Sequence, residues 1–324
     1  MKVTVLLPVY NGEKYLEDAC RSVLNQSFHD FELLIINDGS SDRTSEIINS
    51  FSDPRLRVVN NEQNIGLIKT LNKGIDLAKS DLIARMDADD ICRPKRLQLQ
   101  VDFMNENPDI AISGGLFQAI GTSTSNVVKQ PTNPDVIKSK LLFHTVLAHP
   151  TVIYRKEALV KNSLYYDESY KHAEDYELWV RASRRVKISN LNEVLIDYRF
   201  HDKQVSAEFN NIQIENLNRC RVKQLDEIGI SAGNDEIEIH LNLANQNYRK
   251  EIDFVKQAEK WLLKLHDHNC NVGFFDRAAF DRTLGSYWVA ICKNAAVHKV
   301  FKGSNLNSLK FLTFAQKMRY GIAF

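Results

Sequence analysis

The segment Leu82–Asp90, with the sequence LIARMDADD, decides the predicted fold of this chain. Its apolar first half is typical of a buried strand, and three carboxylates follow directly at the end of that strand. In an open α/β sheet, ligands bind at the carboxyl ends of the strands. Alternate residues of an extended chain point the same way, so Asp87 and Asp89 could together reach a divalent metal and a ribose. The alternative is a helix cap in a solvated turn.

Strands and helices alternate through the N-terminal third of the chain, and this order supports the first interpretation. Each predicted strand is a short apolar run that ends in a turn signal, such as Tyr10-Asn11-Gly12. Such alternation predicts βαβ units around a parallel sheet, with Asp38 and Asp87 at one edge. The predicted strands are 3–9, 31–36, 56–59 and the run ending at Met86, and the predicted helices are 44–48, 67–78 and one after Gly12.

These segments and three later ones resemble, in order, the motifs of the family 2 glycosyltransferases. The matching segments are Pro8-Val9-Tyr10-Asn11, Asn37–Asp42, Asn64-x-Gly66, Asn72-x-Gly74, Met86–Asp90, His149–Val152, Glu174–Trp179 and Tyr198–His201. The resemblance implies the GT-A nucleotide-sugar-binding fold, an α/β fold with a mostly parallel central sheet. It also implies inverting transfer of a sugar from a nucleotide diphosphate donor, with a UDP-sugar preferred and GDP and dTDP left open. One departure is Asn37, where the family often has an aspartate, but the second acidic position, Asp38, is kept.

The resemblance implies a donor-binding role for several of the matching residues. Asp89 would bind Mn²⁺ or Mg²⁺, and His201 would reach the metal or the diphosphate. A divalent cation that bridges two phosphates neutralises the charge of the leaving diphosphate. Asp38 would accept the imide N–H of uracil, although the N1–H of guanine would satisfy the same acceptor. The remaining donor-side candidates are Pro8 and Tyr10 beside the base, and Asp87 beside the ribose or the metal.

On the acceptor side, the resemblance makes Asp175 the candidate general base. A carboxylate within hydrogen-bond reach takes the proton of an attacking hydroxyl, and attack opposite the departing diphosphate inverts the anomeric carbon. A position at a predicted helix start would help to keep Asp175 ionised, although a plain helix cap is the alternative. The other candidates here are Glu174, His149, Arg199 as a bidentate phosphate contact or a salt-bridge partner, and Arg85 as a diphosphate contact or a partner of Asp87.

Composition and charge restrict the class of protein. The 324 residues include 42 Lys and Arg against 41 Asp and Glu, and the resulting net charge of +1 does not indicate a nucleic-acid partner. The five scattered cysteines lack Cys-x-x-Cys spacing, which fits a reducing compartment. Met1-Lys2 leads straight into the first strand, which predicts no signal peptide, and no apolar run approaches the ~18–20 residues of a membrane span. We expect a cytoplasmic location, with a nucleotide-sugar and a glycan or lipid-linked acceptor as partners.

A domain boundary is predicted near Ser206, between a glycosyltransferase domain of residues 1–205 and a helical C-terminal subdomain of residues 206–324. From Asn210 to Leu265 the pattern is helical, with one break predicted at Gly233-Asn234-Asp235. The last stretch, residues 298–320, interleaves basic and apolar side chains. It suits an amphipathic helix on the cytoplasmic face of a membrane, or equally a helix packed on the core with its basic face in solvent.

Two other classes of function share part of this pattern. A catalytically silent relative that binds nucleotide-sugars would keep the fold, but the intact Asp38, Asp89 and Asp175 argue against it. A nucleotidyltransferase would show a glycine-rich basic loop after the first strand, where this chain has Pro8–Gly12. The product distinguishes them, because a transferase releases UDP from a UDP-sugar and a nucleotidyltransferase releases pyrophosphate from UTP.

Overall fold

The computed structural model describes residues 2–122, 126–201 and 210–294. Contacts within the chain define two compact units, one of residues 1–133 and 146–216 and the other of residues 134–145 and 217–324. The predicted boundary at Ser206 lies outside the described residues. The prediction also did not separate residues 134–145 from the first domain, so the helical unit is not one continuous stretch of chain.

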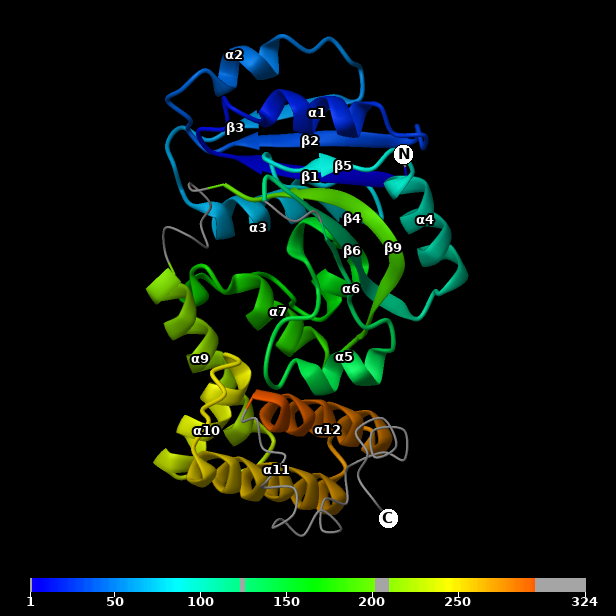
Figure 1. The fold of residues 1–324 in the computed structure, drawn as a ribbon. Helices are drawn as coiled ribbons and strands as arrows, with labels where there is room; N and C mark the ends of the chain where they lie inside the picture. The colour runs from blue at the N-terminus through cyan, green and yellow to red at the C-terminus, as the bar shows by residue number, and fades with distance from the viewer. Residues whose placement is uncertain (1, 123–125, 202–209, 295–324) are drawn as a thin grey trace. The chain divides into compact units, whose positions relative to one another are not determined.

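The first unit contains the whole sheet and the helices that cover it (Figure 1). Its strands are β1 (Val3–Val9), β2 (Phe31–Asn37), β3 (Leu56–Asn60), β4 (Leu82–Arg85), β5 (Ile91–Cys92), β6 (Ile110–Ile120), β7 (Val127–Val128), β8 (Ile153–Arg155) and β9 (Lys187–Arg199). Its helices are α1 (Leu16–Leu24), α2 (Thr44–Asn49), α3 (Leu67–Leu77), α4 (Arg96–Glu106), α6 (Lys156–Lys161) and α7 (Glu174–Ala182), with 3₁₀ turns η1 (His149–Thr151) and η2 (Glu168–Tyr170).

Strand order brings the predicted ligand-binding positions to one edge of the sheet. The described strands form one sheet in the order β3-β2-β1-β4-β8-β6-β9-β5, with β7 beside β6. From β3 to β4 all neighbours are parallel, as predicted, and Val9 lies opposite Asn37. The carboxyl ends of β1, β2 and β4 therefore meet. Beyond β4, β8 runs antiparallel to both of its neighbours, and β6 and β9 pair in parallel.

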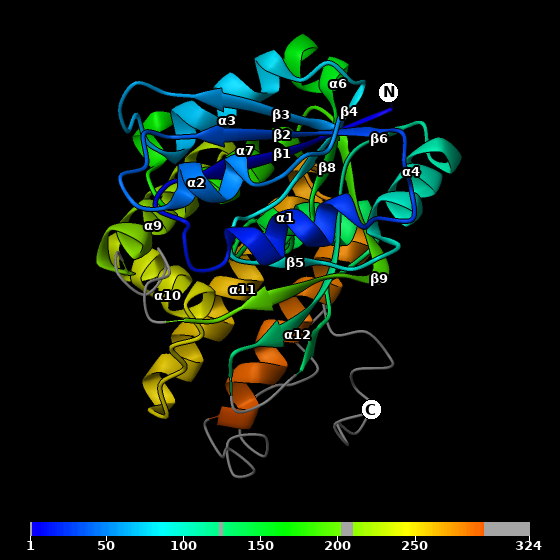
Figure 2. The same ribbon diagram turned by 90° about the horizontal axis from the view of Figure 1, so that it is seen from above.

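Within the parallel part of the sheet, β1, β2 and β4 are buried along their whole length, which explains their nearly continuous apolar runs, whereas β3 at the edge is only partly buried. Val5 and Leu7 of β1 share a core with α1 and α4 on one face, and α3 covers the other (Figure 1). On that second face a Cβ atom at Gly74 would lie 2.3 Å from the Leu6 side chain, so α3 approaches β1 closely. Figure 2 shows α1 beside β5 and β9, where the Ser22 hydroxyl accepts the backbone N–H of Cys92 at 2.9 Å.

The second unit is helical and has a core of its own. Its helices are α5 (Pro134–Lys140), α10 (Asn234–Ala244), α11 (Ile252–Val272) and α12 (Arg277–Asn294), and α9 (Asn210–Glu227) begins in the first unit and ends in the second. Large buried side chains fill the core, including Phe143, Trp261, Phe280 and Trp288. A helix break is found close to the predicted position, but it covers residues 228–233, and the predicted break residues Asn234 and Asp235 already belong to α10. The break between α10 and α11 was not predicted.

The basic and apolar stretch at residues 298–320 also lies outside the described residues, so the structure does not test the helix predicted there. Within the described part of the chain, none of the helices combines the length and the apolar character that crossing a membrane requires.

Gly39 tests how closely the loops that follow β2 and β3 pack against each other. Its φ is +69°, and a Cβ atom there would lie 2.5 Å from the carbonyl carbon of Gln63. We expect Gly39→Ala to lower the free energy of unfolding of the first unit by clearly more than the ~1–2 kcal/mol of left-handed backbone strain. The matched control is Gly273→Ala, since Gly273 has a φ of +68° and nothing within 4 Å of the added atom. Urea denaturation of the full chain, followed by hydrogen exchange in the unit that carries each glycine, measures both losses, and equal losses would contradict the close packing.

Candidate active site

Three carboxylates gather where β4 ends. Asp87, Asp89 and Asp90 each offer one oxygen, and these oxygens all lie within 4.8 Å of one another. Asp90 is 1% exposed, and its Oδ1 accepts the backbone N–H of Arg199 at 2.8 Å. Its Oδ2 has no hydrogen-bond partner among the residues that the structure describes. A buried carboxylate oxygen is expected to have a partner. Oxygen ligands in this arrangement fit Mg²⁺ or Mn²⁺.

The proximity of these acids changes their protonation. Burial raises the pKa of Asp90 to about 8, and the charges of Asp87 and Asp89 add to the effect. Burial likewise raises the pKa of Asp87 to about 6, although Arg85 opposes that rise. The cluster therefore carries less negative charge near neutral pH than three exposed carboxylates would, because repulsion and burial both disfavour the ionised forms.

The end of β9 closes on the same carboxylates from a distant part of the chain. His201 Nε2 lies 3.0 Å from Asp89 Oδ2, and Arg199 Nε donates to the backbone oxygen of Asp89 at 2.9 Å. Antiparallel pairing of β5 with β9 places Ile91 opposite Asp197 and so fixes this approach. The two motifs are 112 residues apart in sequence but share one site. Arg199 is thus engaged with the Asp89 backbone, and its predicted diphosphate contact stays a prediction.

A buried arginine lies beneath the acidic cluster. Arg85 is 3% exposed and its Nη1 donates to Asp87 Oδ2, which is the second of the two roles predicted for it. Its charge also lowers the pKa values of Glu174 and Asp175, which burial raises. One guanidinium thus lies close enough to affect both acidic motifs, so it partly offsets the repulsion between them.

Asp175 is the second residue of α7, as predicted, and is half-buried. Its Oδ1 accepts the backbone N–H of Tyr176 at 2.7 Å. Burial nevertheless raises the pKa of Asp175, so the helix start does not by itself keep this group as acidic as an exposed aspartate. Burial, together with the charge of Asp175, raises the pKa of Glu174 to about 7. A raised pKa makes the ionised Asp175 a stronger proton acceptor.

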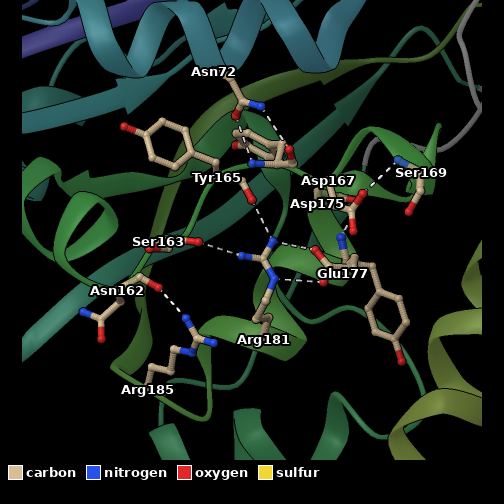
Figure 3. A network of polar contacts seen from close by, with 12 residues as sticks. Asn72, Asn162, Ser163, Tyr165, Asp167, Ser169, Asp175, Glu177, Arg181 and Arg185 are labelled. Atoms are coloured by element: carbon tan, nitrogen blue, oxygen red, sulfur yellow. Dashed lines mark hydrogen bonds and ion pairs between the residues drawn. The ribbon is translucent and has the colours of Figure 1, made fainter.

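A polar network holds α7 and the preceding loop in place (Figure 3). Arg181 of α7 makes a bidentate ion pair with Glu177, with Nε–Oε1 and Nη2–Oε2 distances of 2.9 and 2.7 Å, and also donates to the backbone oxygen of Tyr165 at 2.7 Å. From α3, Asn72 exchanges two 2.9 Å hydrogen bonds with the backbone of Tyr166. Helices α3 and α7 thereby fix the position of Tyr166.

His149 lies under the surface of the site rather than on it. The side chain is 9% exposed, and its Nε2 hydrogen-bonds the Tyr166 hydroxyl at 2.7 Å; that hydroxyl also contacts the hydroxyl of Tyr154 at 2.6 Å. Burial, with the nearby charge of Arg85, lowers the pKa of His149 well below its ordinary value. His149 is therefore a neutral side chain near neutral pH. Its predicted contact with a sugar stays a prediction.

The predicted base-binding residues lie at the ends of β1 and β2. Asp38 is 3% exposed, and both of its oxygens are occupied: Oδ1 accepts from Asn61 Nδ2 at 2.7 Å and from the Ile65 N–H at 3.0 Å, and Oδ2 accepts the Gly66 N–H at 2.9 Å. Asp38 thus holds the 61–66 loop against the sheet. Pro8 is buried within β1, and Tyr10 is 51% exposed just after it. Their predicted contacts with a base stay predictions.

Sequence reasoning missed several residues that build this site. The Tyr15 ring lies 5.1 Å from the His201 ring and 4.5 Å from the Arg199 guanidinium carbon, so it supports both. Arg96, 1% exposed, donates from Nη2 to the backbone oxygen of Arg85 and so fixes the end of β4. Asp90 does not cap α4, because that helix begins at Arg96, after β5. No local pattern marks these roles, which depend on contacts between distant segments.

Comparisons with known proteins agree with this geometry. The model of the family described as glycosyl transferase family 2 matches residues 4–164. An uncharacterized glycosyltransferase from Haemophilus influenzae is 30% identical over 80% of this chain and 83% of its own length. The O-antigen biosynthesis glycosyltransferase WbnJ from Escherichia coli is 32% identical over 62% of this chain and 80% of its own length.

Solved structures show the same fold at low sequence identity. Residues 1–349 of TarS from S. aureus, crystallised with UDP-GlcNAc, match with a TM-score of 0.61 and 20% identity, over 91% of this chain and 89% of that one. The mannosyltransferase PcManGT from Pyrobaculum calidifontis, in complex with GDP-Man and Mn²⁺, matches with a TM-score of 0.56 and 14% identity, over 92% and 88% of the two chains. The predicted GT-A fold is confirmed. The chain belongs to glycosyltransferase family 2 and is a glycosyltransferase.

Proposed function

We propose that this glycosyltransferase moves a sugar from a nucleotide diphosphate donor, a UDP-sugar by preference, to a hydroxyl of a glycan or lipid-linked acceptor. The observation that carries the proposal is the meeting of Asp89 and His201 at 3.0 Å within a cluster of three carboxylates. This cluster lies at the carboxyl ends of the parallel strands, where α/β sheets bind ligands. The relative WbnJ, named for O-antigen biosynthesis, supports a saccharide acceptor.

Asp89 and His201 would hold a divalent cation, with Asp87 and the unpartnered Oδ2 of Asp90 beside it. When bound, Mn²⁺ or Mg²⁺ would neutralise the growing charge of the leaving diphosphate. The Mn²⁺ and GDP-Man bound by the similarly folded PcManGT support this assignment. Arg85 would keep Asp87 in place by its buried ion pair, so that the cluster keeps its shape as its charge changes.

Asp38 and the half-exposed Tyr10 would receive the nucleotide base. A carboxylate has about four lone-pair sites, and Asp38 uses three of them to hold the 61–66 loop. One site is left for a ring N–H, which both uracil and guanine offer. The UDP-GlcNAc complex of TarS supports a UDP-sugar as the donor.

Asp175 would act as the general base. Its negative charge raises the pKa of Asp87, so Asp175 lies near the cluster. Burial and the charge of Asp89 raise that pKa more than Asp175 does. A base beside the metal-binding carboxylates could take the proton of an acceptor hydroxyl as it attacks opposite the leaving diphosphate, which would invert the anomeric carbon. Glu174, with its pKa near 7, and the buried His149 would complete the acceptor side. The predicted membrane contact concerns residues outside the described part of the chain.

Asp89→Ala tests the metal site. The substitution removes a carboxylate ligand, so the dissociation constant of the Mn²⁺–UDP pair should rise about 10-fold or more, as measured by calorimetry. Asp81→Ala is the matched control, because Asp81 is exposed and precedes β4 at its opposite end. Equal binding by the Asp89→Ala variant and the wild type, or full activity of the wild type in EDTA, would exclude this role for Asp89.

Asp175→Asn tests the base. Asparagine keeps the shape but takes up no proton, so UDP binding should survive while transfer falls by roughly 10²–10⁴-fold. Because burial raises the pKa of Asp175, the wild-type rate should fall on acidification at a higher pH than an exposed carboxyl predicts, and the variant should lack that fall. Glu157→Gln, an exposed first-turn acid of α6, is the control. A wild-type rate in the Asp175→Asn variant would refute the general-base role.

A further inference from the structure

Three aromatic rings form a continuous series from the core to the surface of the first unit. Phe117 of β6 packs against the core of the sheet, and its ring centroid lies 5.2 Å from that of Tyr198 in β9. Tyr198 in turn lies 5.1 Å from Phe200, whose side chain is 40% exposed. The inner rings hold the outer one in place, so Phe200 presents an aromatic surface to solvent at little entropic cost.

This aromatic series borders the acidic cluster. Alternate residues of a strand point to opposite sides, and Arg199 and His201 both contact Asp89. Tyr198 and Phe200 therefore occupy the other side of the same strand end. The backbone N–H of Arg199, which lies between Tyr198 and Phe200 in the chain, donates to Asp90 Oδ1 at 2.8 Å, so the strand end that carries both rings adjoins the cluster. Among the described residues, no hydrogen bond engages the Tyr198 hydroxyl.

We propose that Phe200 and Tyr198 form a platform on which a pyranose ring of the acceptor stacks. One face of a pyranose presents C–H groups, which the electron-rich face of an aromatic ring attracts, and binding sites for small molecules combine such rings with a few polar groups. Phe200 would supply the stacking face, and the Tyr198 hydroxyl would bind a sugar hydroxyl. The inference rests on the proposed function, since it assigns the acceptor of that same site.

The two sides of the β9 end favour the acceptor over the donor. Arg199 and His201 contact the ring of Tyr15, which lies just before α1 in the segment that follows the base candidates Pro8 and Tyr10. Tyr198 and Phe200 project from the other side of the same strand end. A sugar on Phe200 would therefore lie on the side of β9 that faces away from the β1–α1 segment.

The test measures sugar binding separately from nucleotide binding. Saturation-transfer NMR would examine a panel of methyl glycosides of glucose, galactose, mannose and N-acetylglucosamine, with the full chain held in excess UDP and Mn²⁺. At least one glycoside should receive saturation on its C–H face from the wild type. Phe200→Ala and Phe200→Leu should weaken that binding about 3- to 10-fold, the size of one aromatic contact, and Phe200→Trp should preserve it. The leucine variant keeps the apolar bulk and so isolates stacking.

UDP binding by calorimetry in Mn²⁺ should be unchanged in all the Phe200 variants. Val160→Ala, which trims a 48% exposed side chain of α6, is the control and should bind glycosides as the wild type does. Normal glycoside binding by Phe200→Ala would refute the platform, as would a wild type that binds UDP but no glycoside. An equal loss of UDP affinity in Phe200→Ala would also refute it, because that result would place the ring on the donor side. A wild type that binds no UDP would count against the proposed function itself.

Discussion

A buried positive charge beneath a set of carboxylates constrains the whole site. Arg85 is 3% exposed, pairs with Asp87, and lowers the pKa values of Glu174 and Asp175 that burial raises. A buried charge is tolerated only when it is paired and hydrogen-bonded. Arg85 therefore allows acids from two distant motifs to share a poorly solvated space, and Arg96 fixes the backbone from which it projects. The protonation of the acids at the sheet edge and at the start of α7 therefore depends on that charge.

Local patterns in the sequence were sufficient for the parallel half of the sheet. Strands β1 and β2 were predicted within one residue, because apolar runs and turn residues mark them directly. Convergence of Asp38 and Asp87 on one edge followed from the geometry of βαβ units alone. The meeting of Asp89 with His201 needed the order of the family motifs as well, since no local property of either segment indicates the other.

Long-range contacts set the limit of what could be predicted. The burial of His149 depends on Tyr166, which Asn72 holds from 94 residues away. The antiparallel strand β8 has only three residues, too few for a periodic signal. Asp38 accepts two backbone hydrogen bonds from residues 27 and 28 positions further along the chain. The residue that the motif predicts as a base contact therefore holds a loop in place. For His149 and Asp38, the contacting residues lie too far along the chain for a local sequence pattern to indicate them.

The division into units has a practical consequence for dissecting this enzyme. The chain passes between the units at 133/134, 145/146 and 216/217, so the helical unit cannot be removed by a stop codon. Leu142 and Phe143 are fully buried in the helical core although they precede α7 and β9 of the first unit in the chain. A protein shortened after residue 216 would expose both side chains to water. Insolubility of such a fragment would then reflect the loss of the helical core and not a folding defect of the first unit.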